Sequence, residues 1–289
     1  MCGIVGLFLK DQRLNAQLGE LLSPMLASMS ERGPDSAGFA VYSDGADERA
    51  KITVQSPDGA ATFHVVARDL GRALEKEVSA SVRGNHAVLS VPGKQVDDAV
   101  AWLHANAPEL RITAVGRRIE IYKDTGEPAH VSDRLELSSL RGTHAIGHTR
   151  MATESAVTTS GAHPFSTGFD QCLVHNGSLS NHNSLRRTLV HDGFAFETEN
   201  DSEVAAAYLT WRMRQGMDLG GALESALDDL DGFYTFVVGT ESGFGVLRDP
   251  IACKPAVMAE TDDYVAFGSE YRALAVLPDI EKARLFEPE

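Results

Sequence analysis

Short apolar runs alternate with helical repeats along the chain and predict a mixed fold of strands and helices. Residues 4–9 form an unbroken apolar run rich in branched and aromatic side chains, which is typical of a strand buried on both faces. Apolar residues between 14 and 29 recur at steps of three and four and predict an amphipathic helix, which Pro24 should bend. Further strands are expected at 38–42, 145–149, 172–174, 233–238, 245–247 and 264–267, and further helices at 200–211 and 219–230.

The pattern changes between about residues 44 and 140. Turn signals such as Asp44-Gly45 and Pro57-Asp58-Gly59 break this part into short pieces. Helices are expected at 70–78 and 96–103, and strands at 87–91, 111–115 and 119–122. We therefore expect one domain over residues 1–289, interrupted at 44–140 by a small α+β insertion in which no catalytic motif stands out.

Composition and charge narrow the class of protein. The chain has 289 residues, 43% hydrophobic and 23% charged, which is usual for a soluble globular protein, and a formal net charge of −15. Such a charge repels phosphate backbones and anionic lipids, so neither nucleic acid nor a membrane is expected as a partner. Three cysteines without a C-x-x-C pair and the lack of a secretory signal or membrane-length apolar run favour the cytoplasm.

Cys2 is the first residue that suggests chemistry. If Met1 is removed, Cys2 carries a thiol and a free α-amine on the same residue. A terminal amine has an ordinary pKa near 7.7–8.0, so at neutral pH a useful fraction can accept the proton of a thiol, whose ordinary pKa is near 8.5. Cys2 could therefore be a nucleophile with its own base, although a cysteine at this position taken alone is more often incidental.

A set of short motifs, in a fixed order, accompanies Cys2. They are Cys-Gly-Ile-Val-Gly (2–6), Arg-Gly-Pro-Asp-Ser (32–36), Gly-His-Thr-Arg-Met-Ala-Thr (147–153), Ala-His-Pro (162–164), Val-His-Asn-Gly (174–177), Asn-Asp-Ser-Glu (200–203) and Arg-Asp-Pro (248–250). Together they resemble the class II glutamine amidotransferase domain over residues 1–43 and 141–270. This resemblance implies an α+β fold, the four-layer αββα sandwich of the N-terminal-nucleophile hydrolases, with Cys2 as the catalytic thiol.

Two further catalytic residues follow from the resemblance. The Asn176 side-chain amide and the Gly177 backbone N–H are two donors that could converge on the oxyanion formed when the thiolate attacks an amide carbon. An Asn-Gly pair is otherwise commonly a simple turn.

The resemblance also implies a grip on L-glutamine at both ends of its amino-acid group. Arg150 would hold the α-carboxylate through two parallel hydrogen bonds, and Thr153 would add a hydroxyl to the same group. Asp201 would pair with the α-ammonium. A surface ion pair for Arg150 and a helix cap for Asp201 are the structural alternatives.

Other motif residues have weaker assignments. Arg32 and His163 are candidate supporting residues, and Asp35 and His148 have structural alternatives as turn supports or core side chains. Segments 248–250 and 267–270 look like corners of the fold and receive no chemistry. The histidines are scattered, so no metal site is expected.

The destination of the ammonia lies outside the motifs. The chain ends soon after the last of them, so we expect a stand-alone glutaminase subunit whose acceptor site is on another polypeptide, in a hetero-oligomer. The arrangement resembles split glutamate synthases and the small subunit of N-methylglutamate synthase. No cofactor is then expected in this chain, while FMN and iron–sulfur groups would sit on partner subunits. The alternatives are hydrolysis of another γ-glutamyl amide and a catalytically silent regulatory subunit.

Overall fold

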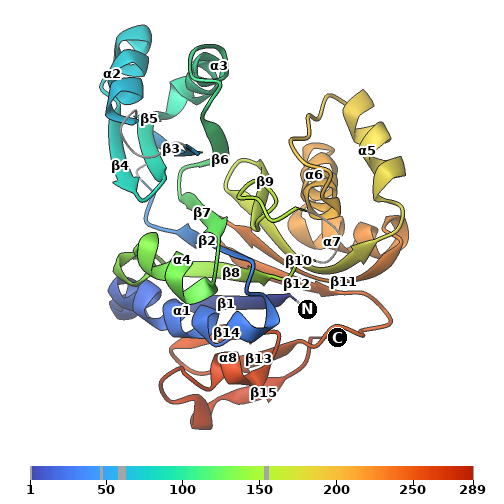
Figure 1. The fold of residues 1–289 in the computed structure, drawn as a ribbon. Coiled ribbons are helices and arrows are strands. Elements are labelled where there is room, and N and C mark those ends of the chain that lie inside the picture. Colours follow the sequence, from blue (N-terminus) through green and yellow to red (C-terminus); the bar gives the residue numbers. More distant parts are fainter. Residues whose placement is uncertain (1, 46–47, 58–62, 153–155, 289) are drawn as a thin grey trace.

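Two antiparallel β-sheets packed face to face, with helices on their outer faces, form the body of the protein (Figure 1). The computed structural model describes residues 2–45, 48–57, 63–152 and 156–288. The order of layers, helix–sheet–sheet–helix, confirms the expected αββα sandwich. Within the described ranges, no helix combines the length and the apolar character needed to cross a bilayer.

The larger sheet has seven strands in the order β15-β13-β14-β1-β8-β2-β7. Its strands are β1 (Gly3–Leu9), β2 (Ser36–Tyr42), β7 (Ile119–Thr125), β8 (His144–Arg150), β13 (Val257–Glu260), β14 (Tyr264–Gly268) and β15 (Arg284–Phe286). Helices α1 (Leu18–Ala27), α4 (Pro128–Arg134) and α8 (Tyr271–Leu274) cover its outer face. Short 3-10 helices occur at Gln12–Gln17, Ser30–Arg32, Gly93–Gln95, Leu137–Ser139 and Ile280–Lys282.

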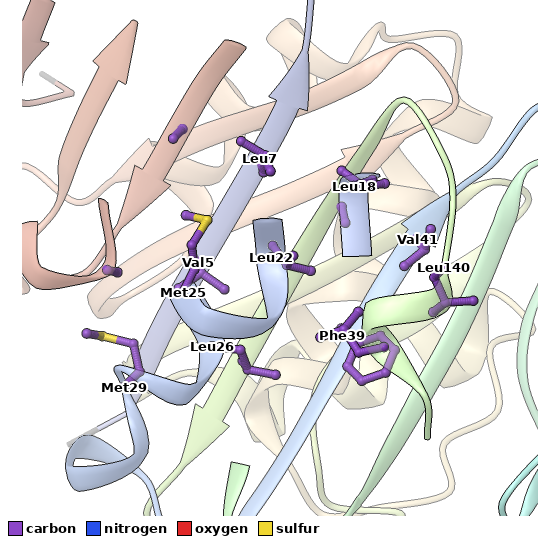
Figure 2. Packing of buried hydrophobic residues seen from close by; sticks show 14 of the residues in the cluster. Val5, Leu7, Leu18, Leu22, Met25, Leu26, Met29, Phe39, Val41 and Leu140 are labelled. Atoms are coloured by element: carbon purple, nitrogen blue, oxygen red, sulfur yellow. The ribbon is translucent and has the colours of Figure 1, made fainter. Parts of the chain in front are cut away.

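Strand β1 is buried on both faces, as its unbroken apolar run predicts. Val5 and Leu7 point toward α1, where they meet Leu22 and Leu26 (Figure 2). Ile4, one position earlier in the alternation, packs into the layer between the two sheets. Full burial of each such side chain stabilises the fold by about 1.5–3 kcal/mol, which anchors the N-terminal residues.

The smaller sheet of the body has four strands in the order β12-β11-β10-β9. Its strands are β9 (Phe165–Gly168), β10 (Gln171–Leu179), β11 (Gly232–Thr240) and β12 (Gly243–Arg248). Helices α5 (His182–His191), α6 (Asp201–Arg214) and α7 (Leu219–Asp229) pack on its outer face. Between the sheets, Val174 and Val237 from this layer meet Ile4, Ile146 and Phe267 from the other.

A third sheet, β4-β5-β3-β6, projects from the body together with α2 (Phe63–Leu74) and α3 (Val96–Asn106) (Figure 1). Its strands are β3 (Arg49–Gln55), β4 (Ser79–Arg83), β5 (His86–Pro92) and β6 (Arg111–Gly116). This unit has its own apolar core. It is narrower than the expected 44–140 insertion, because β7 pairs with β2 along its whole length and α4 packs on α1, so both belong to the body.

Candidate active site

Cys2 is half-buried immediately before β1, and two side chains fix its backbone. Its carbonyl oxygen accepts hydrogen bonds from Arg32 Nε at 2.9 Å and from Asn176 Nδ2 at 3.3 Å. These donors come from the segment before β2 and from β10, so both sheets of the sandwich contribute to the position of Cys2. The structure therefore brings together three of the residues that the motifs single out.

The Asn-Gly pair lies inside β10 and not in a turn. Beyond the end of the strand, the Ser180 N–H donates to Asp231 O at 2.8 Å, which sets the phase of the β10–β11 ladder. Even-numbered residues of β10 direct their main-chain polar groups toward β11, and odd-numbered residues direct theirs away from it. Gly177 lies opposite Tyr234 of β11. The Tyr234 N–H donates to Asp249 Oδ1 and its carbonyl accepts the Asp249 N–H, so the polar groups of Tyr234 point away from β10, in agreement with this alternation.

The main-chain polar groups of the odd-numbered residues of β10 point toward the side on which β9 lies. Strand β9 pairs there with Gln171 and Leu173. Here the carbonyl of His175 accepts from His148 Nε2 at 2.9 Å, and the Leu179 N–H donates to Asp201 Oδ2 at 2.9 Å. The same alternation leads us to expect the Gly177 N–H to point in this direction, between these two bonds. A backbone donor on the residue next to Asn176 is what an oxyanion site would require.

Glycine is required at position 177 for two independent reasons. Its φ of +155° lies in a region that residues with a Cβ rarely adopt. A Cβ built there would also lie 2.0 Å from the carbonyl oxygen of Phe233. The close approach of β10 to β11 therefore depends on the missing side chain.

Arg150 and Asp201 each stand at the end of a regular element. Arg150 is the last residue of β8, buried, and its Nη1 donates to Ala156 O at 3.5 Å. Because Gly3 pairs with Thr149, the Arg150 position lies next to Cys2 across the sheet.

Asp201 opens α6, where Asn200 caps the helix by accepting the Ser202 N–H at 2.9 Å. A negative charge in the first helical turn is stabilised by the helix dipole. Asp201 also receives the Leu179 N–H, so its carboxylate is fixed two residues from Gly177. Thr153 lies outside the described residues, and the adjacent Ala152 N–H donates to Asp35 Oδ2 at 2.8 Å.

His163 lies in a buried layer beneath β10. Its ring lies against that of His148, tilted by 30° with 4.0 Å between centroids, and meets Phe165 edge-on at 5.0 Å. Neither of its ring nitrogens has a hydrogen-bond partner among the described residues. Burial lowers the pKa of His163 well below the ordinary value and that of His148 to about 3, so both rings are neutral at pH 7. His163 and His148 therefore contribute through ring packing and through the hydrogen bond from His148 to the His175 carbonyl of β10.

The buried histidines should make the protein labile to acid. Burial lowers the pKa of His86 to about 3 and that of His144 to about 4, as it does for His148. The unfolded chain binds protons below about pH 6.5, so each ring's contribution is complete above that pH and is lost as the pH falls toward the folded values. The expected loss in unfolding free energy between pH 7 and pH 5 is roughly 2 kcal/mol per buried ring.

Urea unfolding at the two pH values measures this loss. His148→Asn should lower stability at pH 7 and flatten its decline toward pH 5, whereas the same change at the exposed His191 should alter neither. An equal pH dependence in wild type and His148→Asn would show that this ring does not supply the proton uptake.

Two residues near Cys2 were not assigned any chemistry from the sequence. Ser269 Oγ accepts the Ile4 N–H at 2.9 Å, and the Ser269 N–H donates to Ile4 O at 2.9 Å. Glu270, the next residue, forms an ion pair with Arg32. Only the pairing of β14 with β1 brings this segment to the N-terminus, so no local signal could have identified it.

Comparisons with known proteins agree on one family. The family described as glutamine amidotransferase domain matches residues 148–276. The glutamine amidotransferase-like protein GlxB of Rhizobium meliloti is 63% identical over 289 residues, covering 100% of this chain and 96% of that protein. A putative glutamine amidotransferase of Methanothermobacter thermautotrophicus is 33% identical, with 100% and 97% covered.

Longer enzymes match over part of their length. A glutamine–fructose-6-phosphate aminotransferase of Bartonella henselae is 32% identical over 154 residues, which are 53% of this chain and 25% of that enzyme. The glutamine phosphoribosylpyrophosphate amidotransferase structure from B. subtilis matches with a TM-score of 0.60 and 21% identity, over 99% of this chain and 44% of that one. A second structure, an allosteric regulatory enzyme of purine biosynthesis, gives a TM-score of 0.63 at 21% identity over the same shares.

The near full-length match to GlxB, the family match over the second half of the chain and the shared sandwich fold point the same way. We conclude that the chain belongs to the class II glutamine amidotransferases, a family that hydrolyses the side-chain amide of glutamine on an N-terminal-nucleophile fold.

Proposed function

We propose that Cys2, exposed as the first residue after removal of Met1, is the nucleophile that attacks the side-chain amide of L-glutamine. The observation that carries this proposal is the set of contacts around Cys2. Asn176 binds its carbonyl, and the β10–β11 register favours a Gly177 N–H that points away from β11, on the residue next to Asn176. A thiol, a terminal amine and two converging donors are the groups that acyl transfer needs.

The reaction then proceeds in four steps. The α-amine of Cys2 accepts the thiol proton, directly or through water, and the thiolate forms a C–S bond to the amide carbon. Asn176 and Gly177 stabilise the negative charge on the resulting oxyanion. The C–N bond breaks and ammonia leaves with the proton held by the amine. Water then attacks the γ-glutamyl thioester, which returns the free thiol and releases glutamate.

Arg150 and Asp201 give this reaction its selectivity for an α-amino acid. A guanidinium can hold the α-carboxylate with two parallel bonds, and a carboxylate at the other side can pair with the α-ammonium. Asp201 is held rigidly by its bond to Leu179 and by its place in the first turn of α6. Thr153 would add a hydroxyl to the carboxylate. Arg32 and His163 act as supports, through the Cys2 carbonyl and through packing beneath β10.

Arg150→Lys should weaken glutamine binding more than it slows the chemical step. Lysine keeps the charge but loses the planar pair of donors, and a hydrogen bond to a charged group contributes about 1.5–3 kcal/mol. We therefore expect KM for glutamine to rise roughly 10–100-fold with a small change in kcat. Steady-state glutamate release measures both constants. A KM for glutamine in Arg150→Lys equal to that of wild type would contradict the proposed contact between Arg150 and the α-carboxylate.

We further propose that ammonia passes to an acceptor site on a partner synthase subunit, in glutamate or N-methylglutamate synthesis. Two relatives are about as long as this chain, which covers 96% and 97% of their length. The glutamine–fructose-6-phosphate aminotransferase of Bartonella henselae is much longer, since the matched segment is only 25% of it. Relatives of the shorter length are compatible with an acceptor site on another polypeptide, which supports the proposal. In such an assembly FMN and iron–sulfur groups would belong to the partner subunits.

A native pull-down from the source cell tests this assignment, because co-purifying flavin or iron–sulfur subunits are the expected result. A panel of glutamine, asparagine and γ-glutamyl amides tests the substrate. Release of glutamate from glutamine and from no other compound of the panel supports the proposal. Faster hydrolysis of another γ-glutamyl compound would make that compound the substrate instead of glutamine. No hydrolysis by the native complex would indicate a catalytically silent subunit.

A further inference from the structure

The segment that follows β14 reaches the nucleophile through hydrogen bonds. Strand β14 pairs with β1, with Gly268 opposite Val5, and Ser269 then exchanges two hydrogen bonds with Ile4. These bonds fix Glu270 beside the first residues of the chain. Glu270 is therefore placed by the same backbone that places Cys2.

Arg32 connects Glu270 to Cys2. Its side chain is buried, with 6% of its surface exposed, and its Nη1 pairs with Glu270 Oε1 while its Nε donates to the Cys2 carbonyl at 2.9 Å. The other carboxylate oxygen of Glu270 pairs with Arg272 Nε at 2.8 Å, and Arg272 Nη1 pairs with the exposed Glu31 at 2.8 Å. Arg272 and Glu31 thus extend the ion pair of Glu270 outward to the surface, on the side away from Cys2.

A buried guanidinium needs a counter-charge, and Glu270 provides it. The hydrogen bond from Arg32 holds the pKa of Glu270 below its ordinary value, so the carboxylate stays charged at neutral pH. The edge of the guanidinium that carries Nε also carries Nη2, and Nη2 is buried without a partner among the described residues. The orientation set by Glu270 at Nη1 therefore decides how the opposite edge meets Cys2.

We propose that Glu270 is a positioning residue that acts through Arg32 to hold the Cys2 nucleophile against the oxyanion donors. With the carboxylate in place, the guanidinium is locked at one end and the Cys2 carbonyl is bound at the other. Without it, Arg32 loses its fixed orientation, and of the two side chains that bind the Cys2 carbonyl in the described structure only Asn176 keeps its geometry. This inference deepens the proposed function and rests on it for its kinetic readout.

The kinetic test compares Glu270→Gln with Glu31→Gln. The control makes the same chemical change at Glu31, whose carboxylate pairs with the Arg272 side chain, whereas that of Glu270 pairs with Arg32 as well. Glu270→Gln should lower kcat for glutamine hydrolysis about tenfold with KM changed by less than about twofold, because misplacement of a nucleophile acts on the chemical step. Glu31→Gln should match wild type. A Glu270→Gln enzyme with wild-type kcat would overturn the proposal.

A double variant shows whether the effect passes through Arg32. If the two residues act as a unit, Arg32→Lys with Glu270→Gln should have a kcat no lower than that of Arg32→Lys alone. Losses that multiply would mean that Glu270 acts by another route. Because 35% of the Glu270 side chain is exposed, Glu270→Gln should fold, so the comparison with Glu31→Gln decides the matter even where Arg32→Lys does not fold.

A readout without glutamine separates this inference from the proposed function. In a Cys253→Ser background, which removes the exposed thiol, intact mass gives the rate of Cys2 alkylation by iodoacetamide at one pH. Glu270→Gln should change that rate severalfold and Glu31→Gln should not. A changed rate in a chain that hydrolyses no glutamine would support the positioning role while the proposed function fails, and an unchanged rate with an active wild type would do the reverse.

Discussion

Replacing Cys2 by alanine is expected to lower glutamine hydrolysis at least about a thousandfold, because no other group in the site can form the γ-glutamyl thioester. The remaining contacts would still bind glutamine. Steady-state release of glutamate and ammonia from purified protein measures the loss.

The matched control is Cys253→Ala. Cys253 is the exposed free cysteine and lies in the segment between β12 and β13, outside the residues assigned to the site. It should keep wild-type activity. Activity in Cys2→Ala equal to wild type, or an equal loss in both variants, would contradict the assignment of the nucleophile.

Asn176→Ala should lower kcat by about 10²–10³-fold and change KM much less. In the structure one N–H of the Asn176 side-chain amide donates to the Cys2 carbonyl. The second N–H is then available for the oxyanion, which forms only after the thiolate attacks glutamine. The interaction is therefore made in the transition state and not with bound glutamine, which places its loss in kcat.

Asn106→Ala is the control for that substitution. Asn106 ends α3 in the projecting unit, where its amide donates to Trp102 O at 2.9 Å. We expect kcat to be unchanged there. If Asn176→Ala kept the wild-type kcat while Gly177 remained in place, the pairing of these two donors as an oxyanion site would be wrong.

Much of the fold was predictable because the local signals are strong. Apolar residues 4–9 predicted β1 and its burial on both faces, and the spacing of Asn200 and the apolar residues after it predicted the start of α6. The order of the motifs predicted the sandwich, since it carries information about the family that no single segment contains.

Two parts of the fold were not predicted, each for its own physical reason. Helix α5 buries only Leu189, so it lacks the apolar stripe that reveals a helix. Strand β7 was expected as a strand at 119–122, but it was placed in the insertion, because its partner β2 lies about eighty residues earlier and pairing over that distance leaves no local signal. The spacing of Asn200 and Glu203 is typical of a capping box, but Glu203 accepts the N–H groups of Glu197 and Thr198 and not that of Asn200.

The site shows the same division. Cys2, Asn176, Gly177, Arg150 and Asp201 could be singled out because each stands in a short motif, and their roles remain predictions. Glu270 could not be assigned a role, because its contact with Arg32 joins positions 238 residues apart. The neutral charge state of the buried histidines could not be predicted either, since it depends on their burial in the folded protein.

The most direct test of the account is the intact mass of the native protein quenched in acid during turnover of glutamine. We expect a chain that has lost Met1 and carries one γ-glutamyl group, which peptide mapping places on Cys2 and which is absent from Cys2→Ala. Retention of Met1 on a protein that still hydrolyses glutamine, or a γ-glutamyl group on another residue, would contradict it.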